Sequence, residues 1–191
     1  MNLYILLISL LYFAPVKAQF TTNVYWTETS DMAPSNTIYY NPQQKLLWSD
    51  FLGTPGPAGP VAAITTSGFG YKAGMKTMGN KGEINVSVYC YFIKDKSWVK
   101  PGRTTSYILN HEQHHFDVSF IVAGIFIQKI KAAGLTAANC NTILPKLYRE
   151  CCDLMYKMQD DYDGQSRNGQ DHEGQEKWNN FFNEKVPLVT R

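Results

Sequence analysis

The spacing of hydrophobic residues changes near residue 100 and divides the chain into two halves. In Ile84–Ile93 every second residue is apolar, a pattern typical of a strand with one buried face. Val61–Gly70 predicts a second strand, and Gly-Asn and Lys-Gly pairs predict a turn within Lys72–Gly82. Gln19–Asp50 has few helix formers, and Thr54–Pro60 is rich in proline and glycine. We therefore expect extended segments, loops and a small antiparallel sheet before residue 100.

After residue 100 the apolar residues recur with helical spacing. One long helix is expected from about Arg103 to Ala133, with N-cap candidates at 104–106 and Gly134 as its stop. Its stretch Val118–Ile127 is apolar on nearly every face, which predicts a position inside the domain. A second helix is expected at about Thr142–Tyr162. A polar loop (163–171) and a short helix (173–184) follow.

The order of these elements predicts an α+β fold, with a small antiparallel sheet followed by a helical half. Residues 19–191 are expected to form a single domain that is β-rich over 19–100 and helical over 101–191. Hydrophobic residues make up 44% and charged residues 18% of the chain, which excludes a disordered protein. The formal net charge is +2, and no dense basic patch is visible, so we expect no nucleic-acid partner.

The first 18 residues have the pattern of a signal peptide. Residues 3–15 are an apolar run too short to cross a bilayer comfortably, and Val16–Ala18 offers small residues for cleavage before Gln19. The leader has no Lys or Arg near its start, and an N-terminal anchor or a buried first helix is the alternative. We expect a secreted or periplasmic protein with no stable membrane anchor after cleavage.

Four cysteines follow the leader, at positions 90, 140, 151 and 152. In an oxidising compartment they could pair in three ways. Cys140 with Cys151 or Cys152 is the favoured pairing, because it would close a short loop between two helices. Cys90 lies in the alternating strand and is expected in the core. No CxxC spacing is present, so these thiols do not predict a metal site.

The chemistry is concentrated in His111-Glu112-Gln113-His114-His115, an HExxH motif near the start of the long helix. On a helix, His111 and His115 lie one turn apart and within about 40° of each other. Two imidazoles so placed can bind one cation, and zinc prefers such ligands at about 2.0–2.1 Å. Glu112 can then reach a water beside the cation without displacing it. The motif therefore predicts a zinc site with Glu112 as general base.

A catalytic zinc site needs a third protein ligand and one open position. The glycine and third histidine of the metzincin pattern are absent, because Val118 and Ile121 stand at those positions. His172 is favoured as the third ligand because it is the last histidine and follows a helix that can fold back on the first. The remaining candidates are carboxylates: Glu150, Asp160, Asp161, Asp163 and Asp171.

Several further segments carry a resemblance to a known family, over most of the chain from Tyr40 to Trp178. They are Leu46–Gly53 (LLWSDFLG), Ala62–Thr65, Ser97–Val99, His111–Asp117 (HEQHHFD), and Tyr162-Asp163 followed by Ser166, His172, Gln175 and Trp178. In this order they resemble a bacterial family of predicted secreted zinc-dependent proteases. The resemblance implies a zincin-like domain with one Zn²⁺ bound by His111, His115 and His172. In this chain Glu173 replaces a glycine that the family pattern has after the histidine.

Three neighbouring residues have a structural interpretation beside a functional one. Asp117 lies about 140° around the helix from the histidine pair, which favours a structural role over metal ligation. Asp163 could orient a ligand imidazole through its second nitrogen or cap a turn. Tyr162 could donate to an oxyanion, but it also continues the apolar stripe of the second helix.

These features predict a secreted zinc metallopeptidase that cleaves peptide or protein substrates by a zinc-activated water. The Ile84–Ile93 strand is expected to offer an edge on which an extended peptide could dock. Two alternatives stay open: a zinc-dependent cell-wall amidase or peptidase, and a non-enzymatic exported protein with a structural zinc. The oligomeric state does not follow from the sequence.

Overall fold

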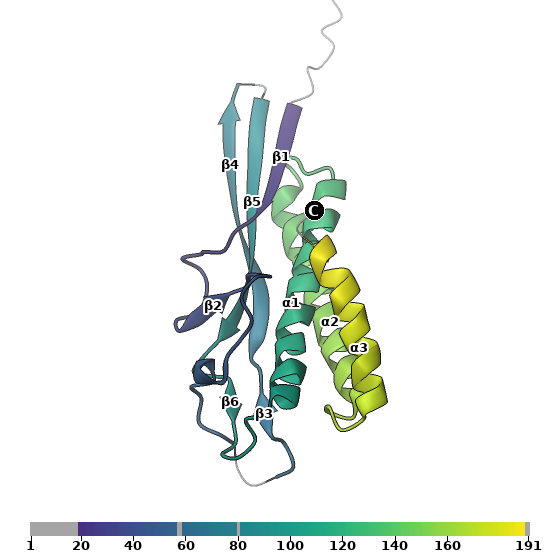
Figure 1. Ribbon diagram of the computed structural model, residues 1–191. Coiled ribbons are helices and arrows are strands. Elements are labelled where there is room, and N and C mark those ends of the chain that lie inside the picture. Colours follow the sequence, from purple (N-terminus) through teal and green to yellow (C-terminus); the bar gives the residue numbers. More distant parts are fainter. Residues whose placement is uncertain (1–18, 57–58, 80, 190–191) are drawn as a thin grey trace, which may run out of the picture.

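The computed structural model describes residues 19–56, 59–79 and 81–189. The predicted signal peptide lies outside these ranges. The described chain has two layers, a twisted sheet and three helices that cover one face of it (Figure 1). The strands precede residue 100 and the three α-helices follow it, which confirms the predicted mixed α+β architecture. Among the described residues, no helix combines the length and hydropathy needed to cross a membrane.

The sheet is built around one long central strand, β5 (Lys81–Ile93). β4 (Ser67–Met78) pairs with it antiparallel along its whole length, and β2 (Thr37–Tyr39) pairs antiparallel with its last residues. β1 (Gln19–Trp26) pairs with the start of β5 in parallel. The expected antiparallel pairing is confirmed for β4 and β5, but the parallel strand β1 was not expected. Because β5 has a neighbour on each side, the edge expected at Ile84–Ile93 for peptide docking is not free.

The turn expected within Lys72–Gly82 is confirmed, because β4 ends at Met78, β5 begins at Lys81, and the two strands form a long hairpin. Gly82, the second residue of β5, also serves the packing of the sheet. A Cβ atom at this position would lie 2.3 Å from the Phe20 ring of β1, so only glycine lets that ring close over β5. The chain reverses near Gly79, whose φ of +57° is left-handed.

Two short strands, β3 (Ala63–Ile64) and β6 (Trp98–Val99), form a separate antiparallel pair below the main sheet. A short 3-10 helix, Trp48–Asp50, precedes β3 along the chain.

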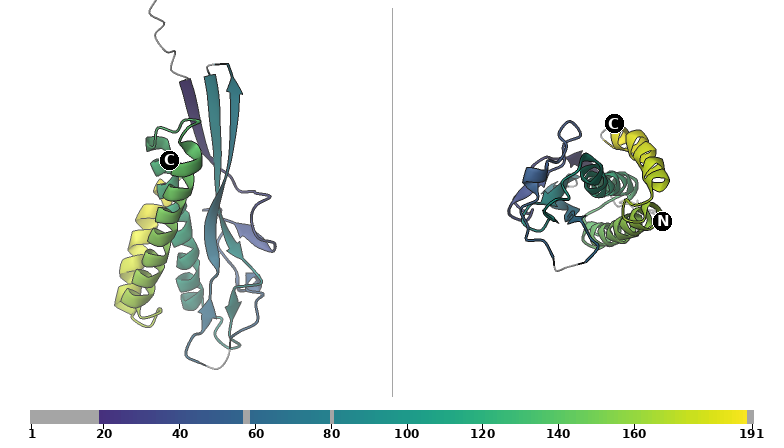
Figure 2. Two further views of the ribbon diagram at one scale, coloured as in Figure 1. Left: turned by 180° about the vertical axis from the view of Figure 1, so that it is seen from behind. Right: turned by 60° about the horizontal axis from the view of Figure 1, so that its bottom comes forward.

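The first helix, α1 (Ser106–Ala132), packs between the sheet and the other two helices (Figure 2). Its N-cap is Thr105, whose side chain accepts from the backbone N–H of Ile108. Val118, Phe120 and Val122 are fully buried, as expected for a helix that is apolar on nearly every face. The predicted central position of this helix is confirmed.

The second helix, α2 (Cys140–Ser166), begins two residues earlier and ends four residues later than predicted. Its extension carries Asp163 onto the helix, so the polar loop shrinks to Arg167–Asp171. The third helix, α3 (His172–Lys185), is N-capped by Asp171, and a short 3-10 helix, Val186–Leu188, follows.

The four cysteines are all free, so the favoured disulfide is wrong. Cys140 is the first residue of α2, and Cys151 and Cys152 lie on the same helix. Eleven residues of helix separate Cys140 from Cys151 by about 16 Å, whereas a disulfide requires Cα atoms within about 7 Å. Cys90 is fully buried in β5, as expected.

Candidate metal centre

Three side chains from two helices converge at one point, and two of them are the histidines of the HExxH motif. His111 and His115 lie one turn apart on α1, and Asp163 approaches them from α2. The two Nε2 atoms are 3.3 Å apart, and Asp163 Oδ1 lies 3.2 Å from each of them. Three ligand atoms thus form a nearly equilateral triangle.

The far nitrogen of each ring is held by a glutamine carbonyl. His111 Nδ1 lies 2.9 Å from Gln175 Oε1, and His115 Nδ1 is hydrogen-bonded to Gln159 Oε1. Both amides are oriented by their own donors, since Gln159 Nε2 donates to the His115 carbonyl and Gln175 Nε2 donates to the Tyr162 hydroxyl. A carbonyl oxygen can only accept, so each ring donates from Nδ1.

This tautomer, assigned from the network, leaves a lone pair on each Nε2. Asp163 Oδ1 also carries lone pairs, and it has no hydrogen-bond partner with good geometry among the described residues although it is buried. Three acceptors therefore point at one another with no proton between them. Such a cluster is costly unless a cation occupies its centre.

The triangle has the size that a tetrahedral zinc site requires. Ligand atoms at about 2.0–2.1 Å from Zn²⁺ in a tetrahedron lie about 3.3–3.4 Å from one another. The observed separations of 3.2–3.3 Å agree with this spacing. Two imidazoles and one carboxylate are also donors that zinc commonly takes, so the residues fit the predicted ion.

The electrostatics of the site favour positive charge. Burial opposes ionisation of Asp163, but the two imidazoles beside it outweigh burial and lower its pKa on balance. Burial likewise disfavours a charged His115, yet the contact with the Asp163 carboxylate and the nearby Glu112 charge raise the pKa of His115 overall. The two carboxylates thus create a negative potential at the triangle.

Glu112 lies next to the triangle and is 4% exposed. Its Oε2 atom is buried and has no hydrogen-bond partner among the described residues. Glu112, both histidines and Asp163 line the same cleft. A buried carboxylate oxygen with no donor, beside a candidate metal site, is placed as a proton acceptor should be.

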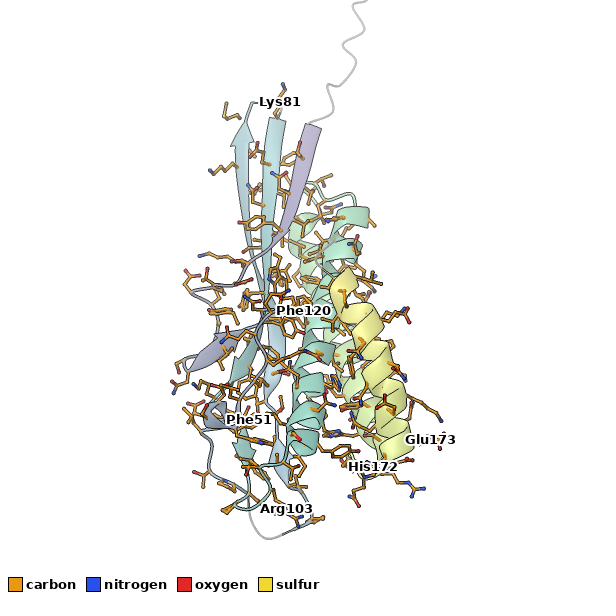
Figure 3. All side chains as sticks on the ribbon, viewed as in Figure 1. Phe51, Lys81, Arg103, Phe120, His172 and Glu173 are labelled. Atoms are coloured by element: carbon orange, nitrogen blue, oxygen red, sulfur yellow. The ribbon has the colours of Figure 1, made fainter. Side chains whose placement is uncertain are left out.

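The structure does not bring His172, the expected third ligand, into this group. His172 is the first residue of α3, and its ring packs against Tyr107 with 4.6 Å between centroids. Figure 3 shows it at the lower end of α3, beside Glu173. The reason is the length of α2, which carries Asp163 to the histidines and delays the loop that was expected to return His172.

The other carboxylate candidates are accounted for elsewhere or lie outside the triangle. Glu150 pairs with Lys129 at 2.9 Å, and thirteen residues of α2 separate it from Asp163. Asp161 pairs with Lys157 on the helix surface, and Asp171 accepts from backbone N–H groups of α3. Asp160 is not part of the group that the described residues form.

Asp117 has the structural role that its position on the helix predicted. It is 1% exposed and accepts hydrogen bonds from the Tyr40 hydroxyl at 2.6 Å and Gln113 Nε2 at 2.8 Å. His114 Nδ1 lies 2.7 Å from its other oxygen. Burial opposes ionisation, but the contact with His114 and the charge of Lys45 lower the pKa of Asp117 on balance.

Tyr162 is fully buried behind the histidines and not in the cleft. Its ring stacks on His111 at 4.6 Å, and its hydroxyl is bonded to Gln175. This position favours the core interpretation over an oxyanion donor.

Two residues at the site, Gln159 and Gln175, have no role that the sequence alone predicts. Gln159 precedes Asp163 by four residues, so it lies on the same face of α2 one turn away. That spacing identifies it only once Asp163 is known to lie on the helix near the metal site. Gln175 comes from a separate helix, and no local spacing relates it to His111.

The cleft that contains the triangle has a volume of about 1010 Å³ and is open to solvent. α1 forms its floor, α2 forms one wall, and β3 with the start of β4 forms the other. Thr65 Oγ1 donates to the Glu112 carbonyl, and Ser67 Oγ donates to the His115 carbonyl. These bonds fix the strand wall to the helix that carries the motif.

Comparison of the chain with protein-family models, curated proteins and solved structures found no match. The functional interpretation therefore rests on the residues and geometry of the chain itself.

Proposed function

We propose that the chain is an exported zinc-dependent metallopeptidase that hydrolyses peptide bonds. The observation that carries this proposal is the triangle of His111 Nε2, His115 Nε2 and Asp163 Oδ1, with the unpartnered carboxylate of Glu112 in the same cleft. Asp163, rather than His172, is the third ligand in this proposal. The zincin-like character of the domain, taken from the HExxH resemblance, belongs to the same proposal.

A Zn²⁺ ion held by His111, His115 and Asp163 would supply a Lewis acid for the substrate carbonyl and for a water. Glu112 accepts the proton of that water at Oε2 and delivers it to the leaving nitrogen. Gln159 and Gln175 keep His115 and His111 in the tautomer that presents Nε2 to the cation.

A catalytic role is favoured over a structural zinc by the number of donors and by access. Structural zinc sites are closed by four protein ligands, whereas catalytic sites have three and an open position. The described residues supply three donors, and the triangle faces an open cleft. Among the described residues β3 pairs only with β6, and we propose that an extended peptide docks on its other edge.

The test is a comparison of zinc content and proteolysis in Glu112→Gln and Glu173→Gln. Glu173 is an exposed carboxylate on α3, so its substitution serves as the matched control. We expect one zinc per molecule in both variants and cleavage of unfolded casein only in Glu173→Gln, with Glu112→Gln at least about a hundredfold slower.

Equal proteolysis in the two variants would refute the assigned role of Glu112. Full zinc content with no hydrolysis of casein by either variant or the unchanged protein would support the structural-zinc alternative. Cleavage restricted to peptidoglycan peptides would instead support the cell-wall enzyme.

A further inference from the structure

One arm of the cleft leads away from the metal triangle, between α2 and β4. We call it the α2–β4 pocket, and its walls are Gly68, Phe69, Tyr91, Tyr148, Cys152, Met155 and Tyr156. The four α2 residues follow one another at helical spacing on the face that also carries Gln159 and Asp163. The pocket therefore opens directly beside the triangle.

The far end of the pocket is closed. The Tyr148 hydroxyl donates to the Phe69 carbonyl at 3.1 Å, which joins α2 to β4 across the groove. The two rings also pack together, with 5.2 Å between centroids. A chain cannot pass through this end, so the arm suits a side chain and not a continuing polypeptide.

The side wall on β4 depends on a glycine. The Tyr91 hydroxyl lies over Gly68, where a Cβ atom would come within 3.0 Å of it. Because Gly68 has no side chain, the Tyr91 ring can lie flat along the strand and leave space towards α2. Met155, which is 7% exposed, lies deeper on the α2 side.

The pocket is uncharged. None of its seven residues has an ionised side chain at neutral pH, and burial raises the pKa of the Tyr91 phenol and of the Cys152 thiol. A lysine or glutamate side chain would lose its hydration here, and none of the seven residues could supply a counterion. An apolar side chain would instead cover Tyr156, which is 63% exposed at the rim.

We propose that the α2–β4 pocket selects a bulky uncharged side chain, aromatic or long aliphatic, next to the scissile peptide bond. The link to cleavage rests on the proposed peptidase function, but binding to the pocket does not. The rest of the cleft also has apolar residues, such as Val61, Ile64 and Ile108, but they share it with Arg103, Glu112 and Asp163, so that part is not uncharged.

Binding can be measured without catalysis, by following methionine methyl resonances during titration with blocked amino-acid amides. Phenylalanine and leucine amides, acetylated on the backbone nitrogen, should shift the Met155 methyl signal. Lysine and glutamate amides should bind at least about tenfold more weakly. Met78 is 84% exposed on the β4–β5 hairpin, away from the cleft, and its signal should not move.

Two variants test the pocket itself. Cys152→Phe should fill it and abolish the Met155 shift, and Tyr156→Ala should weaken binding several-fold while leaving the buried core intact. Asp153→Asn, on the exposed side of α2, is the matched control and should bind as the unchanged protein does. If Cys152→Phe does not fold, Tyr156→Ala alone decides.

The pocket proposal is wrong if the charged amides bind as well as phenylalanine amide, or if Tyr156→Ala leaves binding unchanged. Mapping cleavage sites in casein then tests the link to the reaction. Cleavage next to Phe, Leu or Tyr supports the link, and cleavage without this preference refutes it. If the unchanged protein binds the amides but cleaves no casein, the peptidase function is refuted and the binding role of the pocket is retained.

Discussion

Three histidines lie within little more than one turn of α1, yet their surroundings differ sharply. His114 has an acceptor at each ring nitrogen, Asp117 at 2.7 Å and Asn179 at 3.0 Å, and its ring stacks on Phe182. His111 and His115 have one nitrogen each on a glutamine, and their other nitrogens face each other and Asp163. The hydrogen-bonding groups around His114 are therefore satisfied without a ligand, whereas those of the His111–His115–Asp163 triangle are not. Unmet hydrogen-bonding capacity, and not burial or residue type, separates the candidate metal site from the supporting network.

The largest expected effect comes from removing a donor of the triangle. His115→Ala and Asp163→Ala should each weaken zinc binding at least about a thousandfold, because a zinc-binding free energy of about 10–16 kcal/mol is shared among few ligands. Competition with a chromogenic chelator measures this affinity. His114→Ala and His172→Ala are the controls and should keep nanomolar-range binding comparable to the unchanged protein. Release of zinc by His172→Ala would restore the original third-ligand prediction.

A substitution in the cluster around Asp117 and His114 should lower the stability of the protein and leave its zinc content unchanged. Asp117→Ala leaves His114, Tyr40 and Gln113 without their shared acceptor and should lower the free energy of unfolding by about 3 kcal/mol. Urea unfolding of the metal-free protein measures the loss, and metal analysis of the folded fraction should still give one zinc per molecule. Less than one zinc per molecule in Asp117→Ala would show that the cluster around Asp117 also supports the metal site.

The smallest of these effects is expected at the glutamine that links α2 to the triangle. Gln159→Ala removes the acceptor of His115 Nδ1 and should weaken zinc binding about 10–100-fold. Gln170→Ala, an exposed glutamine that lines the cleft, is the matched control. Rescue of affinity by Gln159→Glu, which restores an acceptor, would distinguish orientation of the ring from a general packing defect.

Local patterns in the sequence were sufficient for the helices and for the histidine pair. The i, i+4 spacing of His111 and His115 is fixed once the segment is helical, so their convergence follows from the motif alone. Asp163 is among the candidates, but the sequence favours His172, because His172 is the last histidine and residues 163–171 have the composition of a polar loop. Packing of Tyr162 and Ser166 against the core keeps residues 163–166 helical. The parallel pairing of β1 with β5 is likewise a long-range choice that no local pattern encodes.

Asp163 follows His115 by nearly fifty residues and stands on a different helix. An unfolded polypeptide therefore holds no preformed site, and an isolated α1 would bind a cation only weakly, through two nitrogen ligands. Tight capture of the cation must wait until α2 has docked on α1. If the protein is exported as proposed, a precursor threaded through a membrane pore in extended form would carry no bound ion and no hydrolytic capacity. The separation of the ligands along the chain would by itself delay activation until folding on the far side.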